Sequence, residues 1–115
     1  MISEQCSMVV YHITVEDFVY SINVRGIDPL YSRGKMKASW YVSKHNIQWA
    51  IIHTSVGHHE PVESLVVCAV HVMGKDMFKF NRPGFYYTFK AHVIESATPA
   101  LFFLHSIGMG EIEND

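Results

Sequence analysis

The sequence has little of several features that mark common protein classes. Of its 115 residues only Cys6 and Cys68 are cysteines, and their number and spacing match neither a disulfide framework nor a zinc site. Charged residues make up 17% of the chain and the formal net charge is −2, so no global positive field draws the protein to nucleic acid or to an anionic membrane. Any binding of phosphate is therefore expected to be local.

Long hydrophobic runs are also lacking. No run approaches the roughly 20 apolar residues of a membrane span, and the N-terminus lacks the basic start and apolar stretch of a signal peptide. We therefore expect a soluble protein of the reducing cytoplasm, without a membrane partner. A chain of this length fits one core, so residues 1–109 are expected to form a single domain and residues 110–115 a frayed acidic tail.

Apolar and aromatic residues, in contrast, are plentiful. Hydrophobic residues make up 49% of the chain and aromatic residues 13%, which is enough to bury a core and too much for a disordered chain. The aromatic side chains also provide flat surfaces on which a ligand ring or a base can stack. The composition therefore fits a folded domain with a ligand cleft.

Hydrophobic patterning predicts an α+β fold. The continuous, β-branched run 65–72 is typical of a strand buried on both faces and is expected at the centre of a sheet. Shorter runs predict further strands at 8–12, 38–42, 76–80, 85–89 and 100–104. The segment Asn81-Arg82-Pro83-Gly84 predicts a turn between the strands at 76–80 and 85–89.

Helical spacing predicts two helices in the N-terminal half. The first spans about 15–25, with Thr14 and Asp17 in the pattern of a helix cap and Gly26 at its end. The second is expected to be capped by Ser43 and to stop at Gly57. One face of this second helix should be formed by Ile47, Ala50, Ile51 and Thr54.

Two motifs carry a resemblance to a known family. Tyr11-His12-Ile13-Thr14 precedes the first helix, and Arg25-Gly26-Ile27-Asp28-Pro29 follows it, leading into a basic loop at 31–37. This order resembles the opening of the ADP-ribosyltransferase superfamily, whose members have Tyr/Leu-His-Gly-Thr and then a Gly-Leu-x-Pro turn; Ile13 stands where they have glycine. The layout is nearest to the catalytic lobe of RNA 2′-phosphotransferases, whose Gly-Val-Trp-Leu-Thr strand is similar to Gly84-Phe85-Tyr86-Tyr87-Thr88.

The resemblance implies a split, mostly antiparallel sheet whose cleft holds NAD+ against His12 and the 31–41 segment. The cofactor-binding residues implied are His12, Ile13, Thr14, Arg33, Lys35, Trp40 and Tyr41. The catalytic residues implied are His12, Tyr41 and, for the glutamate that the family places on a late strand, Glu95, the only acid between Asp76 and Glu111. Because neighbours on a strand point opposite ways, only one of Trp40 and Tyr41 can face the cleft.

Three functions follow from this resemblance. The first is NAD+-dependent mono-ADP-ribosyl transfer to a protein or nucleic-acid acceptor, and the small size fits a toxin or phage-conflict protein. The second is a phosphotransferase-like reaction in which NAD+ accepts a phosphate from RNA, held by Arg33 and Lys35. The third is a non-catalytic module that binds NAD+, ADP-ribose or a protein partner. The sequence leaves the acceptor and the oligomeric state open.

Each candidate residue also has a plainer interpretation. His12 can be a structural histidine, and Arg33, Lys35 and Lys37 can form a solvated loop. His53, His58 and His59 match no standard zinc motif, so we expect no metal site. Cys68 lies in an apolar run where a thiol stays protonated and inert.

Overall fold

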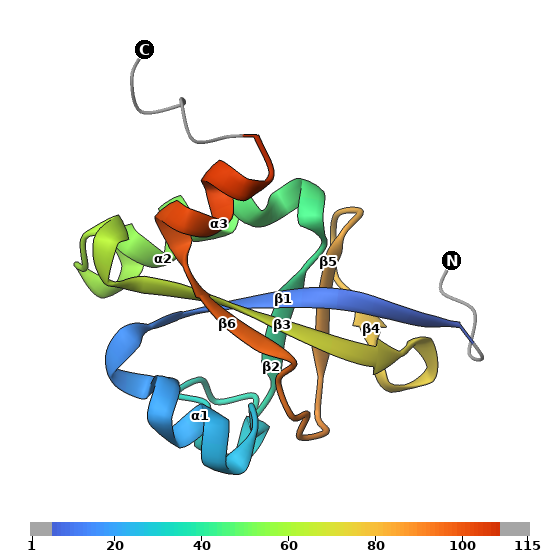
Figure 1. Ribbon diagram of the computed structural model, residues 1–115. Helices are drawn as coiled ribbons and strands as arrows, with labels where there is room; N and C mark the ends of the chain where they lie inside the picture. Colours follow the sequence, from blue (N-terminus) through green and yellow to red (C-terminus); the bar gives the residue numbers. More distant parts are fainter. Residues whose placement is uncertain (1–5, 109–115) are drawn as a thin grey trace.

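The computed structural model describes residues 6–108, and in this part of the chain it contains a six-stranded sheet and three α-helices (Figure 1). All neighbouring strands are antiparallel, in the order β4-β5-β2-β1-β3-β6. The strands are β1 (Ser7–Val15), β2 (Ser39–Val42), β3 (Leu65–Met73), β4 (Phe78–Lys79), β5 (Phe85–Thr88) and β6 (Ser96–Pro99). The helices are α1 (Val19–Arg25), α2 (Ile47–His58) and α3 (Ala100–Ser106). The predicted α+β fold with an antiparallel sheet is confirmed, with one helix more than expected.

The helices cover both faces of the sheet, α2 and α3 on one side and α1 on the other (Figure 1). On β3, Leu65 and Val67 join the core beneath α2 and α3, whereas Val66 and Cys68 join the core beneath α1. Successive side chains of the strand therefore pack into apolar cores on opposite faces of the sheet. This explains why apolar and polar residues do not alternate along this run. The strand lies inside the sheet between β1 and β6, but next to the edge strand and not at the centre of the sheet, where it was expected.

The predicted strand at 100–104 is wrong, because these residues begin α3. Ala100 and Leu104, one helical turn apart, are buried in the core shared with α2, and Phe103 packs against the same core. A short run of consecutive apolar residues fits a strand and a buried helix equally well. The neighbouring strand of the sheet, β6, is instead formed by the less apolar residues 96–99.

Three predicted helix boundaries are also wrong in detail. Strand β1 continues through Val15, so Thr14 is a buried strand residue paired with Val66 and caps nothing. Ser43 precedes a 3₁₀ turn at 44–46 and its hydroxyl accepts a hydrogen bond from the Asn46 side chain. Helix α2 continues past Gly57 and ends at His59, which adopts the left-handed conformation. Gly26 does end α1, with φ +78°.

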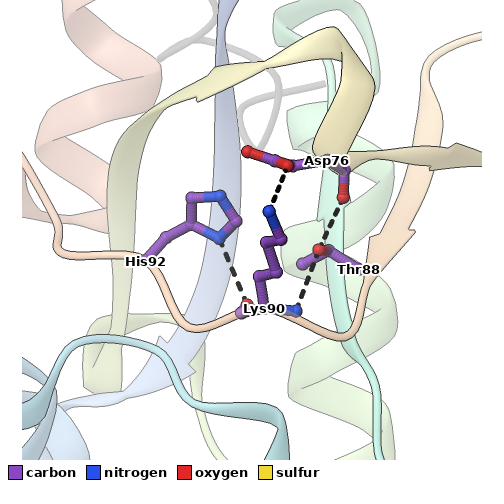
Figure 2. A network of polar contacts seen from close by, with 4 residues as sticks. All are labelled: Asp76, Thr88, Lys90 and His92. Carbon is purple, nitrogen blue, oxygen red and sulfur yellow. Dashed lines mark hydrogen bonds and ion pairs between the residues drawn. The ribbon is translucent and has the colours of Figure 1, made fainter.

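A polar network fixes the segment that follows β5 (Figure 2). The Thr88 hydroxyl donates to the carbonyl oxygen of Asp76 at 2.7 Å and accepts from the Lys90 backbone N–H at 3.1 Å. The Lys90 ammonium donates to the Asp76 carboxylate at 2.8 Å, and the Lys90 carbonyl accepts from His92 Nδ1 at 3.2 Å. The predicted strand at 76–80 is accordingly shorter, because residues 74–76 form a 3₁₀ turn held by this network and β4 contains only 78–79.

The predicted acidic tail at 110–115 lies outside the described residues. Within residues 6–108, no helix has the length and apolar character needed to cross a membrane.

Candidate functional site

A cavity of about 580 Å³ lies between β1, α1 and the loop at 31–38. This volume is within the range of small-molecule and cofactor sites. The Asp28-Pro29 turn directs the chain from α1 back to this cavity, because the Asp28 carboxylate accepts from the Leu30 N–H at 3.0 Å and Pro29 begins a 3₁₀ turn. The helix, the turn and the loop thus form three sides of one depression, with β1 as its floor.

His12 is the titratable group on the floor of this cavity. Its Nδ1 lies 2.8 Å from the backbone carbonyl oxygen of Trp40, and because a carbonyl can only accept, Nδ1 carries the proton. Burial lowers the pKa of His12 from its usual 6.5; the Trp40 hydrogen bond opposes this shift and nearby His58 adds to it. At neutral pH the ring is therefore uncharged, and Nε2 is a hydrogen-bond acceptor.

The rim of the cavity is rich in positive charge. Arg25 and Arg33 both line it, whereas Asp28 is the one carboxylate in the lining and already holds the Leu30 N–H. The Arg25 guanidinium lies 4.1 Å from the centre of the Tyr31 ring, and that of Arg33 lies 5.9 Å from the Phe18 ring. Each guanidinium is thus paired with an aromatic ring that also lines the cavity.

The structure brings together five of the residues suggested by the sequence. Along the cavity lie His12, Ile13, Thr14, Arg33 and Trp40. Lys35 lies on the same loop as Arg33 but is exposed and does not line the cavity.

Trp40 and Tyr41 face opposite sides of the sheet, as neighbours on a strand must. The Tyr41 ring is on the side of His12, with 5.7 Å between ring centres, but it is only 2% exposed and belongs to the core beneath α1. The Trp40 ring instead packs against Phe80 and Tyr87 on the other side. Near the cavity, Trp40 therefore contributes its backbone carbonyl. The rings of Trp40 and Tyr41 are packed against other side chains.

Glu95 does not line the cavity. It is exposed and lies 3.5 Å from His71 Nδ1. On β3, His71 alternates with Val70 and Val72, which belong to the core beneath α1, so the His71 side chain projects to the face opposite His12. The acid suggested for the catalytic role thus lies across the sheet from the cavity.

Several residues that line the cavity were not named individually as site residues from the sequence, among them Phe18, Arg25, Tyr31 and His58. Arg25 and Tyr31 had a usable signal, because they flank the Gly26 to Pro29 segment that joins α1 to the basic loop. His58 had none, since it comes from the last turn of α2, which packs mainly on the other face of the sheet.

His53 and the buried thiol of Cys68 are both engaged in packing. The His53 ring stacks on Trp49 with 4.6 Å between ring centres, and within residues 6–108 no three His, Cys, Asp or Glu side chains cluster closely enough to hold a metal ion. Cys68 is buried, and burial raises the pKa of its thiol to about 11, which confirms that it is protonated at neutral pH.

Comparisons of the chain with protein-family models, with curated proteins and with solved structures found no match. The case for a function therefore depends on the chemistry of the cavity.

Proposed function

We propose that the protein binds a pyrophosphate-bearing nucleotide, NAD+ in the first instance, in the cavity between β1, α1 and the 31–38 loop. The observation that carries this proposal is the combination of an uncharged His12 with Arg25 and Arg33 in one lining. A pyrophosphate is bound by guanidinium groups through charge-assisted hydrogen bonds, and a ribose hydroxyl can donate to a neutral imidazole nitrogen.

The aromatic rings that line the cavity favour a nucleotide as the ligand over a simple phosphate. Tyr31 and Phe18 line the cavity and are exposed by 62% and 42%, so their faces can pack against a base or a nicotinamide ring. The rings of Trp40 and Tyr41, which the resemblance implied for cofactor binding, pack against other side chains of the sheet and the core.

A transfer reaction is the second step of this proposal. The RNA phosphotransferase-like reaction depends on arginine and histidine. It is favoured because Arg33 and His12 line the same cavity. ADP-ribosyl transfer that depends on a late glutamate receives no support from Glu95, which lies across the sheet. A reducing compartment such as the cytoplasm belongs to the same proposal, because Cys6 and Cys68 are both unpaired.

Calorimetric titration with NAD+ and with ADP-ribose tests the binding step. Losing a hydrogen bond to a charged group costs about 1.5–3 kcal/mol, so Arg33→Ala is expected to weaken binding roughly ten-fold or more. Lys35→Ala is the matched control, because it removes a cation from the same loop without touching the cavity. Equal losses in both variants, or no binding of either ligand to the wild type at millimolar concentration, would contradict the proposal.

Turnover is measured separately. Labelled NAD+ is incubated with the protein and cell lysate, with and without 2′-phosphorylated RNA, and nicotinamide release and the position of the label are followed. Release only with the RNA supports the phosphotransferase-like reaction, and labelling of a lysate component supports ADP-ribosyl transfer. Binding without release identifies a non-catalytic NAD+ or ADP-ribose module.

A further inference from the structure

Three aromatic side chains form a row across neighbouring strands at one end of the sheet. Phe78 of β4 pairs with Tyr87 of β5, which pairs in turn with Trp40 of β2. The ring centres of Phe78 and Tyr87 are 5.2 Å apart and those of Tyr87 and Trp40 are 5.1 Å apart. Phe80 and Phe89 contact this row at ring distances of 5.0 Å and 5.6 Å. We call these five residues the aromatic surface.

The aromatic surface is open to solvent. Trp40 is 40% exposed, and Phe78, Phe80 and Phe89 are exposed by 49%, 49% and 52%. It lies on the same face of the sheet as α2 and α3, but those helices pack over β1, β3 and β6 (Figure 1). Within the described residues, α2 reaches this end of the sheet chiefly through Trp49, whose ring contacts Phe85 at 5.0 Å. Contiguous exposed apolar patches are typical of interaction sites on soluble proteins.

Charge is distributed unevenly around this surface. The segments 29–59 and 77–94 contain no aspartate or glutamate, and they include β2, β4, β5 and α2. Seven of the nine lysines and arginines of the chain lie in them: Arg33, Lys35, Lys37, Lys44, Lys79, Arg82 and Lys90. The overall charge of −2 therefore hides two segments that contain no carboxylate and carry most of the positive charge of the chain.

The cations lie on both sides of the aromatic row, toward the two ends of strands β2 and β5. At one end, the Arg82 guanidinium is 4.3 Å from the Phe85 ring and 4.9 Å from the Trp49 ring. Lys44 is close to this end, because neighbouring Ser43 donates its N–H to the carbonyl of Gly84 at 2.8 Å. At the other end, Ser39 pairs with Thr88, which places Lys37 and Lys90 two residues beyond that pair.

We propose that the aromatic surface binds a single-stranded oligonucleotide, with bases stacked on the exposed rings and phosphates held by the flanking cations. The Phe78 ring stacks with one face on Tyr87, and Trp40, Phe78, Phe80 and Phe89 are exposed by 40% to 52%. Their exposed ring surface can accept any base, since every base has an aromatic face. Arg82 and Lys44 supply the attraction for a phosphodiester backbone, whereas Lys90 is already paired with the Asp76 carboxylate at 2.8 Å. An apolar protein partner would use the rings but would leave the segregated positive charge without a counterpart.

This inference does not rest on the nucleotide cavity. The cavity lies on the α1 side of the sheet and the rings of the aromatic surface lie on the other side. A protein that fails to bind NAD+ can still bind an oligonucleotide here, so the two proposals fail separately.

Fluorescence anisotropy with a labelled eight-nucleotide oligouridine tests the proposal on the full chain. Stacking on one aromatic ring contributes about 1–3 kcal/mol, so Phe78→Ala is expected to weaken binding roughly five-fold or more. Phe102→Ala is the matched control, because Phe102 is 66% exposed on α3, outside this surface. Circular dichroism and thermal unfolding establish that each variant keeps the fold.

Salt dependence separates the role of the phosphates from that of the rings. Each neutralised phosphate of a single strand contributes about −0.7 to the slope of log K against log salt concentration, so Arg82→Ala should make that slope shallower by about 0.7. Lys75→Ala, which alters a cation outside the carboxylate-free segments, should leave the slope unchanged.

Several outcomes would overturn the proposal. They are no binding of the oligonucleotide at 50 mM salt, stronger binding of a duplex of comparable length, and equal effects of Phe78→Ala and Phe102→Ala. A wild-type dimer in sedimentation that Phe78→Ala dissociates, together with no oligonucleotide binding, would assign the aromatic surface to a second copy of the chain.

Discussion

The imidazole Nδ1 of His12 donates a hydrogen bond to the carbonyl oxygen of Trp40 at 2.8 Å, while the Trp40 ring packs against Tyr87 on the opposite face of the sheet. One residue of β2 therefore serves two surfaces, orienting the histidine of the cavity with its main chain and extending the aromatic surface with its side chain. Substituting the Trp40 side chain should alter the aromatic surface and leave the His12 hydrogen bond intact, because that bond uses only the backbone.

The lowered pKa of His12 makes a specific prediction about stability and pH. Since the folded-state pKa lies below the usual 6.5, the unfolded chain binds the proton first as pH falls. The stability linked to His12 is thus complete above pH 6.5 and declines as pH falls from there toward the folded-state pKa. We expect His12→Gln to lose less unfolding free energy than the wild type between pH 8 and pH 5, measured by urea denaturation.

The control for this pH experiment is His105→Gln, because His105 is exposed on α3. This variant should follow the wild-type pH profile. A His12→Gln profile identical to that of the wild type would show that His12 does not contribute.

Two glycines in different settings should respond to alanine in opposite directions. At Gly26, φ is +78° and an added Cβ would lie 2.6 Å from the backbone carbonyl oxygen of His92, so Gly26→Ala should destabilise the protein by more than about 1 kcal/mol. At Gly57, inside α2, an added Cβ meets no atom within 4 Å, so Gly57→Ala should stabilise it by about 0.5–1 kcal/mol. Thermal unfolding of both variants gives the comparison, and shifts of the same sign would contradict it.

The network beside β5 contains both a buried hydrogen bond and an exposed ion pair, so their contributions to stability can be compared (Figure 2). Thr88→Val leaves the Asp76 carbonyl and the Lys90 N–H without their partner at a fully buried position, which should cost about 1–3 kcal/mol. Lys90→Met removes an ammonium that is 65% exposed, and exposed pairs are worth less than about 1 kcal/mol. Urea denaturation should therefore rank Thr88→Val as the more destabilised variant; the reverse order would refute this assignment.

Tyr41→Phe should make the protein more stable. Its hydroxyl is buried and makes no hydrogen bond to the described residues, and burial, with a smaller effect of nearby Cys68, raises its pKa well above the usual value of 10. Removing an unpartnered buried hydroxyl should stabilise the fold by about 1 kcal/mol. Tyr20→Phe, at a site 80% exposed, is the control and should leave the melting temperature unchanged. A lower melting temperature for Tyr41→Phe would indicate that the hydroxyl has a partner.

Several elements could be predicted because their signals are local. The run at 65–72 is apolar except for His71, and the structure buries both faces of its first part, Leu65 to Cys68. Gly26 and the Asp28-Pro29 turn were predicted from backbone chemistry that depends on few neighbours. His12 and Arg33 were suggested by a motif and a loop, and both line the cavity.

The failures have a different physical origin. Residues 100–104 form a helix because their apolar side chains dock one helical turn apart on the core of α2, a docking surface that exists only after folding. Thr14 matched a capping pattern, but pairing with β3 extended the strand past it. Glu95 was chosen by elimination along the sequence, and it contacts His71 and does not line the cavity.

The sequence alone determined which residues form apolar runs, where glycine and proline turn the chain, and that only one of Trp40 and Tyr41 can face a given side. Tertiary structure alone decided which side each one faces, and with it the separation of the cavity from the aromatic surface. The reason is that alternation along a strand allows either set of alternate side chains to face a given side of the sheet. Only the packing of the helices against the sheet selects which set faces which side.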